Sequence, residues 1–471
     1  MKKKALLSSI LTIVLCLSLI AGSTFALFTS ETTVDIEVDA GRVSIEAGLT
    51  SPVLYSVTPD AAGTEFDENG KPYRYEEQTG TFANGGTATL DESNGIISLV
   101  NVTPGDKITF NLTGANTSDV AVQYRYKLEV VEGYDLMSGF VVTVEGTKYA
   151  SMAEYVSAWE GLAVGSNINE VALALELPVS AGNEYQELNA KIKLSVEAVQ
   201  ANADTADTDM ISVKYITTVN DSAELLSKLY ADEYLHIFLN EDIEGTVEIT
   251  EDLTDKTIDA NGNYAHLSFK SGTLTNVVVK NLDTNTLNIA TGVNGDITIE
   301  DSYFTSDTKL GSAGTNAFIA GRGAASDNLD VTVEGCTFDA QGVVDYGVYF
   351  MNIQNLTIRD CEIKNTKSWA VQANGTGGNF VISDTLFDTC TGIIKGAVNG
   401  GAGSGSLEGN FTFANNKMDD CVKKPYETNK TPVYMNLAPI SGTITFSNNT
   451  MNDVVVTVED MGLLGQKYFT E

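Results

Sequence analysis

The chain has 471 residues, enough for two domains of ordinary size, and carries a formal net charge of -35 at pH 7. Only 19% of the residues are charged, with 28 Lys and Arg against 63 Asp and Glu, so the imbalance reflects scarce bases. Because phosphate binding needs clustered Lys and Arg, this composition argues against a nucleic-acid partner. An acidic surface favours solubility, and it also suits divalent cations such as Ca2+ or basic partners.

The first 26 residues have the features of an export signal. Three lysines at positions 2–4 precede an apolar stretch over 5–20, and Thr24-Phe25-Ala26 provides a small-residue cleavage site after Ala26. The apolar stretch is too short for a permanent membrane span, and no second stretch of spanning length follows it. We therefore expect a secreted protein, extracellular or cell-surface associated, with no stable membrane span after processing.

The region 27–200 alternates apolar and polar residues, as in Ile192, Leu194, Val196 and Ala198, which predicts half-buried strands. Several short motifs accompany this alternation. They are Ala26-Leu-Phe28, Val38-Asp-Ala40-Gly41, Val102-Thr-Pro104-Gly105-Asp106, Asn116-Thr-Ser118 and Leu175-Glu-Leu177-Pro178. The motifs resemble the camelysin/TasA family of exported Gram-positive proteins, whose leader is removed by a dedicated signal peptidase of the SipW type. This resemblance implies a jelly-roll-like β-sandwich over 27–200 and a place on the cell surface or in a biofilm matrix.

Members of that family are matrix fibre subunits or have been called metalloproteases. The two histidines, His236 and His266, lie outside this region, and the chain has no His-Glu-x-x-His motif to hold zinc, so the protease interpretation finds no support. Fibre assembly would use the N-terminal strand, 34–45, to complete the sheet edge of a neighbouring copy. The alternative, which we favour, is that this strand pairs within its own domain.

Residues 201–214 are polar and aperiodic, which predicts a linker. Beyond it, Asp221-Ser-Ala-Glu224 predicts the start of a short helix over about 221–232, with Leu225 and Leu229 on its apolar face. We expect this helix to cover the open end of the domain that follows. At the other end of that domain, 454–458 predicts a last strand with little after it to cover it, and therefore an exposed edge.

An eight-residue pattern occurs six times between residues 297 and 451. Its first, third and eighth positions are apolar, its fifth is Asp, Asn or Gly, and its sixth is small or polar. The copies begin at Ile297, Val331, Leu356, Phe380, Phe411 and Ile444. This alternation predicts a strand, a turn and a second strand, and a repeat of this length is typical of one coil of a parallel solenoid. Stacked coils lie about 4.8 Å apart, so the sixth position becomes a polar ladder and the eighth an apolar spine.

The repeat resembles the right-handed parallel β-helix of the pectin-lyase-like superfamily over about 236–460. The fold class that we predict is therefore all-β, with a jelly-roll-like sandwich followed by a right-handed parallel β-helix over 215–471 and its N-terminal capping helix. The resemblance implies a fold more than an activity, because this fold is found in lyases, hydrolases, adhesins and inert spikes.

Four cysteines remain once Cys16 leaves with the leader. Cys336 and Cys361 share the ladder position on consecutive coils, and Cys390 and Cys421 share a later position. The coil spacing permits a disulfide within each pair, and export favours oxidation. Free stacked thiols are the alternative that we favour, because Cys is also a good small buried residue. We expect no metal at these thiols.

The position after the apolar spine holds candidate catalytic residues, namely Asp339, Lys364, Asp388 and Asp419 on successive coils. Asp388 and Asp419 would lie about one coil apart, near the spacing of the carboxylates in retaining glycosidases. Asp339, Lys364 and Asp388 could instead form a base flanked by calcium-binding acids, as in a lyase. The interpretation that we favour is structural: Asp at a strand end forms side-chain turns, and Lys364 neutralises its neighbours.

Tyr346, Tyr349 and Trp369 fall on neighbouring coils, where exposed rings could stack on sugars, although a core position is the interpretation that we favour. Taken together, the sequence predicts an exported, non-catalytic cell-surface or matrix protein, structural or adhesive and possibly glycan-binding, from a Gram-positive bacterium. Its partners would be carbohydrate or other surface and matrix proteins. No cofactor is required, with Ca2+ as the one candidate. The alternative function is a polysaccharide lyase or glycoside hydrolase acting on acidic or host glycans.

Overall fold

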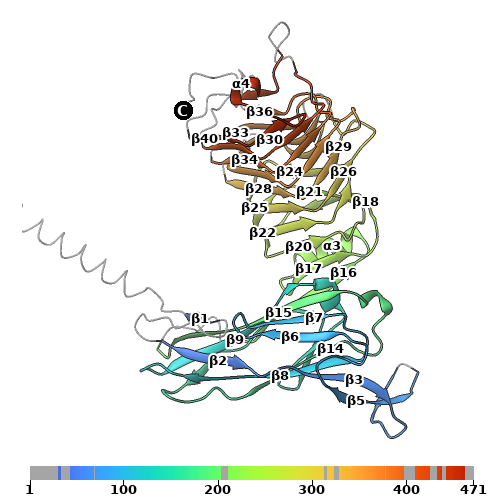
Figure 1. The fold of residues 1–471 in the computed structure, drawn as a ribbon, viewed down its shortest axis with the longest axis vertical. Coiled ribbons are helices and arrows are strands. Elements are labelled where there is room, and N and C mark those ends of the chain that lie inside the picture. Colours follow the sequence, from blue (N-terminus) through green and yellow to red (C-terminus); the bar gives the residue numbers. More distant parts are fainter. Residues whose placement is uncertain are drawn as a thin grey trace, which may run out of the picture. The chain divides into compact units, whose positions relative to one another are not determined.

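The computed structural model describes residues 30–32, 43–67, 69–202, 210–311, 316–322, 328–376, 378–396, 409–424, 432–437 and 442–461. The predicted leader with its cleavage site after Ala26, most of the proposed assembly strand and residues 203–209 of the predicted linker lie outside this part. The chain divides into two compact units, Met1–Ile216 and Thr217–Glu471 (Figure 1). Within the described residues, no helix is long and apolar enough to cross a membrane.

The first unit is a sandwich of two antiparallel sheets. One sheet has the order β11-β10-β14-β8-β3-β5-β4, and β2 also pairs with β8. Its strands are β2 (Ile45–Leu49), β3 (Val53–Pro59), β4 (Glu65–Phe66), β5 (Pro72–Gln78), β8 (Asp106–Asn116), β10 (Val141–Val144), β11 (Thr147–Ala150) and β14 (Val171–Glu176). The other contains β6 (Thr87–Asp91), β7 (Ile96–Val100), β9 (Val122–Glu132), β12 (Met152–Val156), β13 (Glu160–Leu162) and β15 (Asn189–Gln200). The alternating residues of β15 from Ile192 to Ala198 are buried, so the apolar faces of both sheets form one core.

The described part of the N-terminal segment pairs inside this unit. Strand β1 (Ser30–Thr32) lies antiparallel on β15, with Ser30 opposite Ala198, and β2 pairs with β8. The last residues of the predicted linker, 212–214, are the first residues of strand β16 (Ser212–Val219), and they pair with β12. Two short helical segments, α2 (Tyr134–Ser138) and η1 (Asn183–Tyr185), connect strands of the unit.

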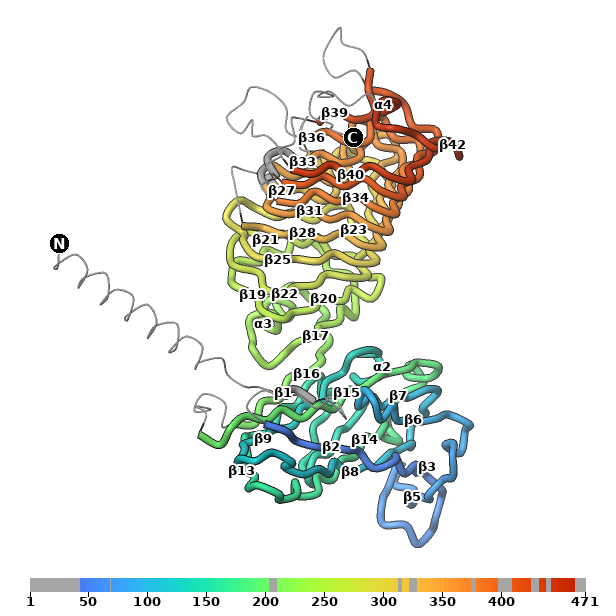
Figure 2. Tube along the Cα trace, turned by 60° about the vertical axis from the view of Figure 1, so that its left-hand side comes forward, coloured from blue at the N-terminus to red at the C-terminus, as the bar shows by residue number. Residues whose placement is uncertain are grey.

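The second unit is a parallel β-helix built from three sheets (Figure 2). Sheet 1 comprises β17 (Tyr234–Leu239), β19 (Leu253–Thr254), β20 (Thr257–Asp259), β22 (Gly272–Lys280), β25 (Val293–Glu300), β28 (Leu329–Glu334), β31 (Asn355–Arg359), β34 (Phe380–Ser383), β37 (Phe411–Ala414) and β40 (Ile444–Ser447). Sheet 2 comprises β23 (Asp283–Thr284), β26 (Tyr303–Thr305), β29 (Thr337–Asp339), β32 (Glu362–Lys364), β35 (Leu386–Asp388), β38 (Lys417–Asp419), β41 (Thr450–Met451) and β42 (Val454–Val455). Sheet 3 comprises β18 (Ile243–Ile249), β21 (Ala265–Phe269), β24 (Leu287–Ala290), β27 (Ala317–Arg322), β30 (Tyr346–Ile353), β33 (Val371–Thr376), β36 (Ile394–Gly396) and β39 (Met435–Leu437). The predicted fold class is thereby confirmed.

The repeated pattern sets the register of sheets 1 and 2. The first residues of all six copies pair with one another from Ile297 to Ile444. The fifth residues, which form the turn from sheet 1 to sheet 2, have φ angles of 45° to 63°; they are Asp301, Gly335, Asp360, Asp384, Asn415 and Asn448. Only Gly, Asn and Asp enter this left-handed region at low cost. The turn therefore explains why these residue types recur at that position.

The interior follows the same pattern. The eighth residues of the first five copies are fully buried; they are Phe304, Phe338, Ile363, Phe387 and Met418. In the polar ladder, Asn416 donates from Nδ2 to the Ile382 carbonyl at 3.0 Å, and its Oδ1 accepts from the Thr385 amide at 3.0 Å. Asn449 continues the ladder on the next coil, where its Nδ2 donates to the Phe413 carbonyl at 2.8 Å. The buried amides of this ladder are therefore satisfied by backbone groups.

Both ends of the β-helix carry helical segments. Helix α3 (Ser222–Leu229) begins where the Asp221 carboxylate accepts hydrogen bonds from the amides of Ala223 and Glu224, and Leu225 and Leu229 are buried in the core of the β-helix. At the C-terminal end, the predicted strand over 454–458 is only partly correct. Asn452 and Asp453 adopt positive φ angles of 49° and 63°, so β42 folds back antiparallel on β41. Helix α4 (Val458–Met461) follows, and its last residue packs into the core.

A buried carboxylate in the first coil makes stability depend on pH. The Asp259 Oδ2 atom lies 3.3 Å from His236 Nε2 and 3.3 Å from Lys280 Nζ, and Oδ1 accepts from Asn281 Nδ2 at 2.9 Å. Burial raises the pKa of Asp259, but the hydrogen bonds from His236 and Asn281 and the charge of Lys280 outweigh it and hold this pKa below its ordinary value of 3.8. The carboxylate therefore stabilises the fold at neutral pH, and this contribution is lost as the pH falls from 3.8 through the folded-state pKa. In thermal melts followed by circular dichroism, we expect Asp259→Asn to lower Tm at pH 7 and to match the wild type in strong acid. An equal deficit at both pH values would contradict this account.

Candidate functional site

The four predicted catalytic residues form one row on the outer face of sheet 2. Asp339 lies opposite Lys364, Lys364 opposite Asp388, and Asp388 opposite Asp419 on adjacent strands. Each side chain already has a local partner. The Asp339 Oδ1 atom accepts from the Gln341 amide at 3.1 Å and from Asn365 Nδ2 at 2.9 Å, which is a side-chain turn extended to the next coil.

The other members of the row are also bound locally. Lys364 Nζ lies 3.3 Å from Glu362 Oε2, two residues earlier on the same strand; burial opposes the charged amine, but Glu362 outweighs it and raises the pKa of Lys364. Asp388 accepts from the Thr389 hydroxyl at 2.8 Å, and Asp419 lies 2.9 Å from Lys417 Nζ. In this row Lys364 and Asp419 form ion pairs along their own strands, and Asp339 and Asp388 are held by hydrogen bonds, so the four side chains do not converge on one point.

The cysteines are buried and free on the two ladders. Cys336 donates to the carbonyl of Glu334 at 3.3 Å, and Cys361 to that of Arg359 at 3.1 Å. Cys390 and Cys421 donate instead to carbonyls of the preceding coil, those of Ile363 at 3.1 Å and Phe387 at 3.4 Å. The hydrogen bond with the partner thiol (Cys361 for Cys336, Cys390 for Cys421) and then burial raise the pKa of Cys336 and of Cys421. Protonated buried thiols of this kind are poor nucleophiles.

The aromatic residues lie neither in the main core nor on an open surface. Tyr346, Tyr349 and Trp369 are 7%, 6% and 3% exposed, and they pack with Ala320 and Val433 in a cluster separate from the core of the β-helix. The Tyr346 and Tyr349 ring centroids are 5.2 Å apart. Because the rings are buried, stacking of a sugar on exposed rings does not describe this arrangement. They form instead an apolar wall on the outer face of sheet 3.

A second row, which the sequence did not predict, continues from that wall. Tyr349 lies opposite Gln372, Gln372 opposite Lys395, and Lys395 opposite Asn436 on consecutive strands of sheet 3. Their strand neighbours Val371, Ile394 and Met435 fill the core, so the row lies on the outer face. We call Tyr349, Gln372, Lys395 and Asn436 the sheet-3 row. It crosses three strand spacings, about 14 Å.

The sheet-3 row contains buried polar atoms without hydrogen-bond partners. Gln372 is 4% exposed and Asn436 is 0% exposed. Gln372 Oε1 and both amide atoms of Asn436 have no partner in the described part of the chain. Each unsatisfied buried group costs about 1–3 kcal/mol, so a native structure that retains several of them in one row calls for an explanation.

Lysine amines adjoin these amides. Lys395 is partly exposed at the centre of the row, and burial lowers its pKa. Lys424 donates from Nζ to the Ser368 hydroxyl. Burial lowers the pKa of Lys424 as well; Asp345 opposes this shift, whereas Lys395 and Lys367 reinforce it. The row therefore combines hydrogen-bonding amides, cationic amines and an aromatic wall.

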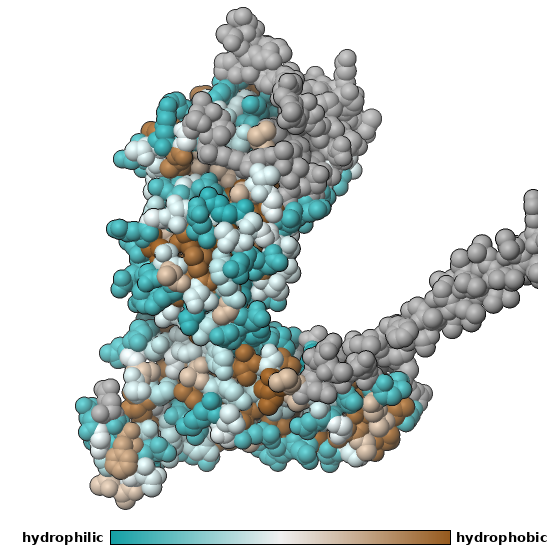
Figure 3. All heavy atoms as spheres, turned by 180° about the vertical axis from the view of Figure 1, so that it is seen from behind, coloured by the Kyte–Doolittle hydropathy of each residue, from teal (hydrophilic) through white to brown (hydrophobic). Residues whose placement is uncertain are grey.

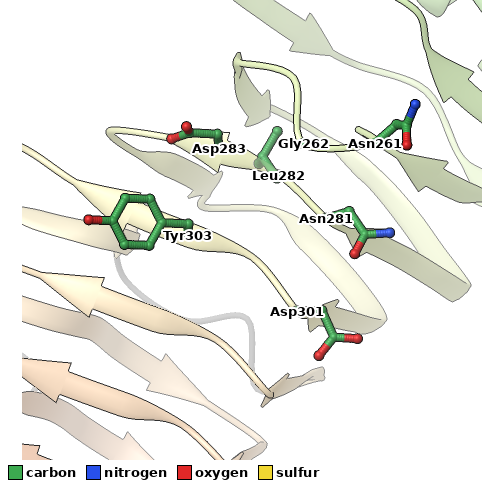
Figure 4. Close-up of a pocket in the computed structure, with 7 residues that line it drawn as sticks. All are labelled: Asn261, Gly262, Asn281, Leu282, Asp283, Asp301 and Tyr303. Atoms are coloured by element: carbon green, nitrogen blue, oxygen red, sulfur yellow. The ribbon is translucent and has the colours of Figure 1, made fainter.

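A shallow groove lies elsewhere on the β-helix, where the first coils turn from sheet 1 to sheet 2 (Figure 4). It has a volume of about 440 Å³ and is lined by Asn261, Gly262, Asn281, Leu282, Asp283, Asp301 and Tyr303. Figure 4 shows Asp283 and Asp301 at opposite ends, so the two carboxylates do not converge on one point. Burial and then Asp242 raise the pKa of Asp283. Among the described residues, no group of three or more His, Cys, Asp or Glu side chains could hold a metal ion.

The sequence missed the sheet-3 row because sheet 3 lies outside the repeated pattern. Its strands are joined by segments of unequal length, and the register of 348–352 against 370–374 could not be fixed. Val348 lies opposite Val371 and Phe350 opposite Ala373, which places Tyr349 and Gln372 side by side. The available signal was the alternation Val371-Gln-Ala373 and Met435-Asn-Leu437, in which a polar residue interrupts apolar neighbours.

No protein-family model and no curated protein matches this chain. Among solved structures, it is similar to a variant catalytic domain of a GH87 alpha-1,3-glucanase in complex with nigerose, at 10% identity and a TM-score of 0.21, covering 87% of this chain and 100% of that one. It is also similar to the SRRP of L. reuters 100-23, at 14% identity and a TM-score of 0.22, covering 50% of this chain and 98% of that one. At these scores neither similarity bears on function.

Proposed function

We propose that this chain is an exported, non-catalytic surface or matrix protein whose β-helix binds a glycan along the sheet-3 row. The observation that carries the proposal is the partly exposed Lys395 amine, which lies on the strand between Gln372 and Asn436, two residues whose amides include atoms without a hydrogen-bond partner in the described structure. Sites for sugars combine an apolar surface with a few convergent hydrogen-bonding groups. Hydroxyl groups both donate and accept, so a glycan could satisfy an amide oxygen and an amide N–H at once.

The leader and the resemblance of residues 27–200 to camelysin/TasA proteins support export and a matrix role. The surface agrees with exposure to water. On the face drawn in Figure 3, hydrophilic residues cover most of the described surface of the β-helix, and apolar residues occur in small separate groups. In this proposal the β-helix holds the glycan site on a rigid frame, while the first unit connects the protein to other surface or matrix proteins.

The test is a glycan array combined with a depolymerisation screen of residues 27–471, with and without calcium. We expect binding without cleavage products, and we expect Gln372→Ala to weaken binding about tenfold, as the loss of one buried hydrogen bond predicts. Asp388→Ala and Lys364→Ala serve as controls on sheet 2 and should bind as the wild type does. Cleavage products that vanish in these two variants would overturn the proposal, as would the absence of binding to every glycan.

A further inference from the structure

We infer that the sheet-3 row selects anionic saccharides, with Lys395 and Lys424 holding the carboxylate or sulfate group of the sugar. This inference rests on the proposed function and adds the charge class of the glycan. It comes from the distribution of charge around the row, which differs from that of the chain as a whole.

The chain carries 28 Lys and Arg against 63 Asp and Glu, yet among the described residues cations predominate near Lys424. Among the described residues, the charged groups that act on the Lys424 amine are Asp345, Lys395 and Lys367. Counted with Lys424 itself, the described part of the chain contributes three amines and one carboxylate to this patch. A positive patch on so acidic a protein repels cationic and attracts anionic ligands.

Unlike three paired lysines of sheets 1 and 2, Lys395 has no acid partner among the described residues. Lys280, Lys364 and Lys417 lie 3.3, 3.3 and 2.9 Å from Asp259, Glu362 and Asp419. In the described part of the chain, no carboxylate lies within ion-pair distance of Lys395, and burial alone lowers its pKa. A partly buried amine without a counter-ion is unfavourable. A bound anion would supply that counter-ion.

The amides on either side of Lys395 indicate that the anion belongs to a sugar. Lys395 lies between Gln372 and Asn436, one strand away from each. Gln372 Oε1 is an acceptor, so a small inorganic anion without a hydrogen to donate would leave it unsatisfied, whereas a hydroxyl group can donate to it. The Gln372 oxygen, the Lys395 amine and the Asn436 amide lie in this order along the row. This order matches a saccharide that presents hydroxyl groups next to an acidic group.

The experiment compares an oligogalacturonide with the same oligosaccharide after its carboxyl groups have been reduced to alcohols. Isothermal titration of the wild type should give at least tenfold tighter binding to the anionic form, with an affinity that falls as salt increases. In Lys395→Met this preference should fall to near one, whereas Lys395→Arg should keep most of it. Lys364→Met is the matched control, because that amine is already paired with Glu362. A heparin oligosaccharide distinguishes recognition of sulfate from recognition of carboxylate.

The outcomes separate this inference from the proposal on which it rests. Equal or tighter binding of the neutral oligosaccharide would overturn the charge selectivity and leave glycan binding standing. An unchanged preference in Lys395→Met, in a variant whose circular dichroism spectrum and Tm match the wild type, would remove Lys395 from the site. Failure of every saccharide to bind would overturn both.

Discussion

Phe338→Ala is expected to lower the free energy of unfolding of the β-helix by about 3–5 kcal/mol, the range for removing a large buried aromatic side chain. Phe338 is 0% exposed. Its ring centroid lies 4.8 Å from that of Phe304 and 6.1 Å from that of Phe318. Truncation would leave a cavity between stacked coils, and each coil is supported mainly by its two neighbours. The loss therefore affects packing on both sides.

Denaturant unfolding followed by circular dichroism would measure this effect. Val454→Ala is the control, since Val454 is 65% exposed at the end of sheet 2 and also loses apolar carbon atoms. We expect its unfolding midpoint to stay near that of the wild type. Similar losses in the two variants would mean that the spine at Phe338 contributes no more than a surface position does.

Sheets 1 and 2 could be predicted because each coil repeats the physical demands of the previous one. A turn with a positive φ angle requires Gly, Asn or Asp, and the buried spine that follows it requires an apolar residue. Residues of the same types as Asp360 and Ile363 therefore recur on each coil. The C-terminal end departed from prediction because Asn452 and Asp453 both take positive φ angles and reverse the chain. Two adjacent turn formers were visible in the sequence, but the direction of the next strand was not.

At the candidate sites, knowing which side chains lie side by side did not reveal which groups they pair with. The sequence could place Lys364 between Asp339 and Asp388, because sheet 2 follows the repeat. It could not show that Glu362, on the same strand, holds the Lys364 amine. Sheet 3 has no such repeat. The sequence therefore could not show that Lys395 and Asn436 are neighbours, which follows from the pairing of β36 with β39. The strongest candidate site therefore lies where sequence periodicity carries no information.

Asn436→Leu is expected to raise the free energy of unfolding by about 1–2 kcal/mol while weakening glycan binding at least tenfold. Both amide atoms of Asn436 are buried without a partner in the described structure, and replacing such a group by an apolar side chain of similar shape removes its desolvation cost. A residue that lowers stability and raises affinity is what a binding site retains. Thermal and denaturant melts would be compared with titration of the tightest-binding oligosaccharide.

Asn416→Leu is the matched control, because Asn416 is a similarly buried amide in the interior polar ladder of the same β-helix. Its Nδ2 donates to the Ile382 carbonyl, and its Oδ1 accepts from the Thr385 amide, both at 3.0 Å. Removing it leaves those backbone groups unsatisfied, which costs about 1–3 kcal/mol each. We therefore expect the two Asn→Leu substitutions to change stability in opposite directions, and only Asn436→Leu to change binding. A loss of stability in both variants would show that the Asn436 amide is satisfied in solution, and the argument for a ligand at the sheet-3 row would then fail.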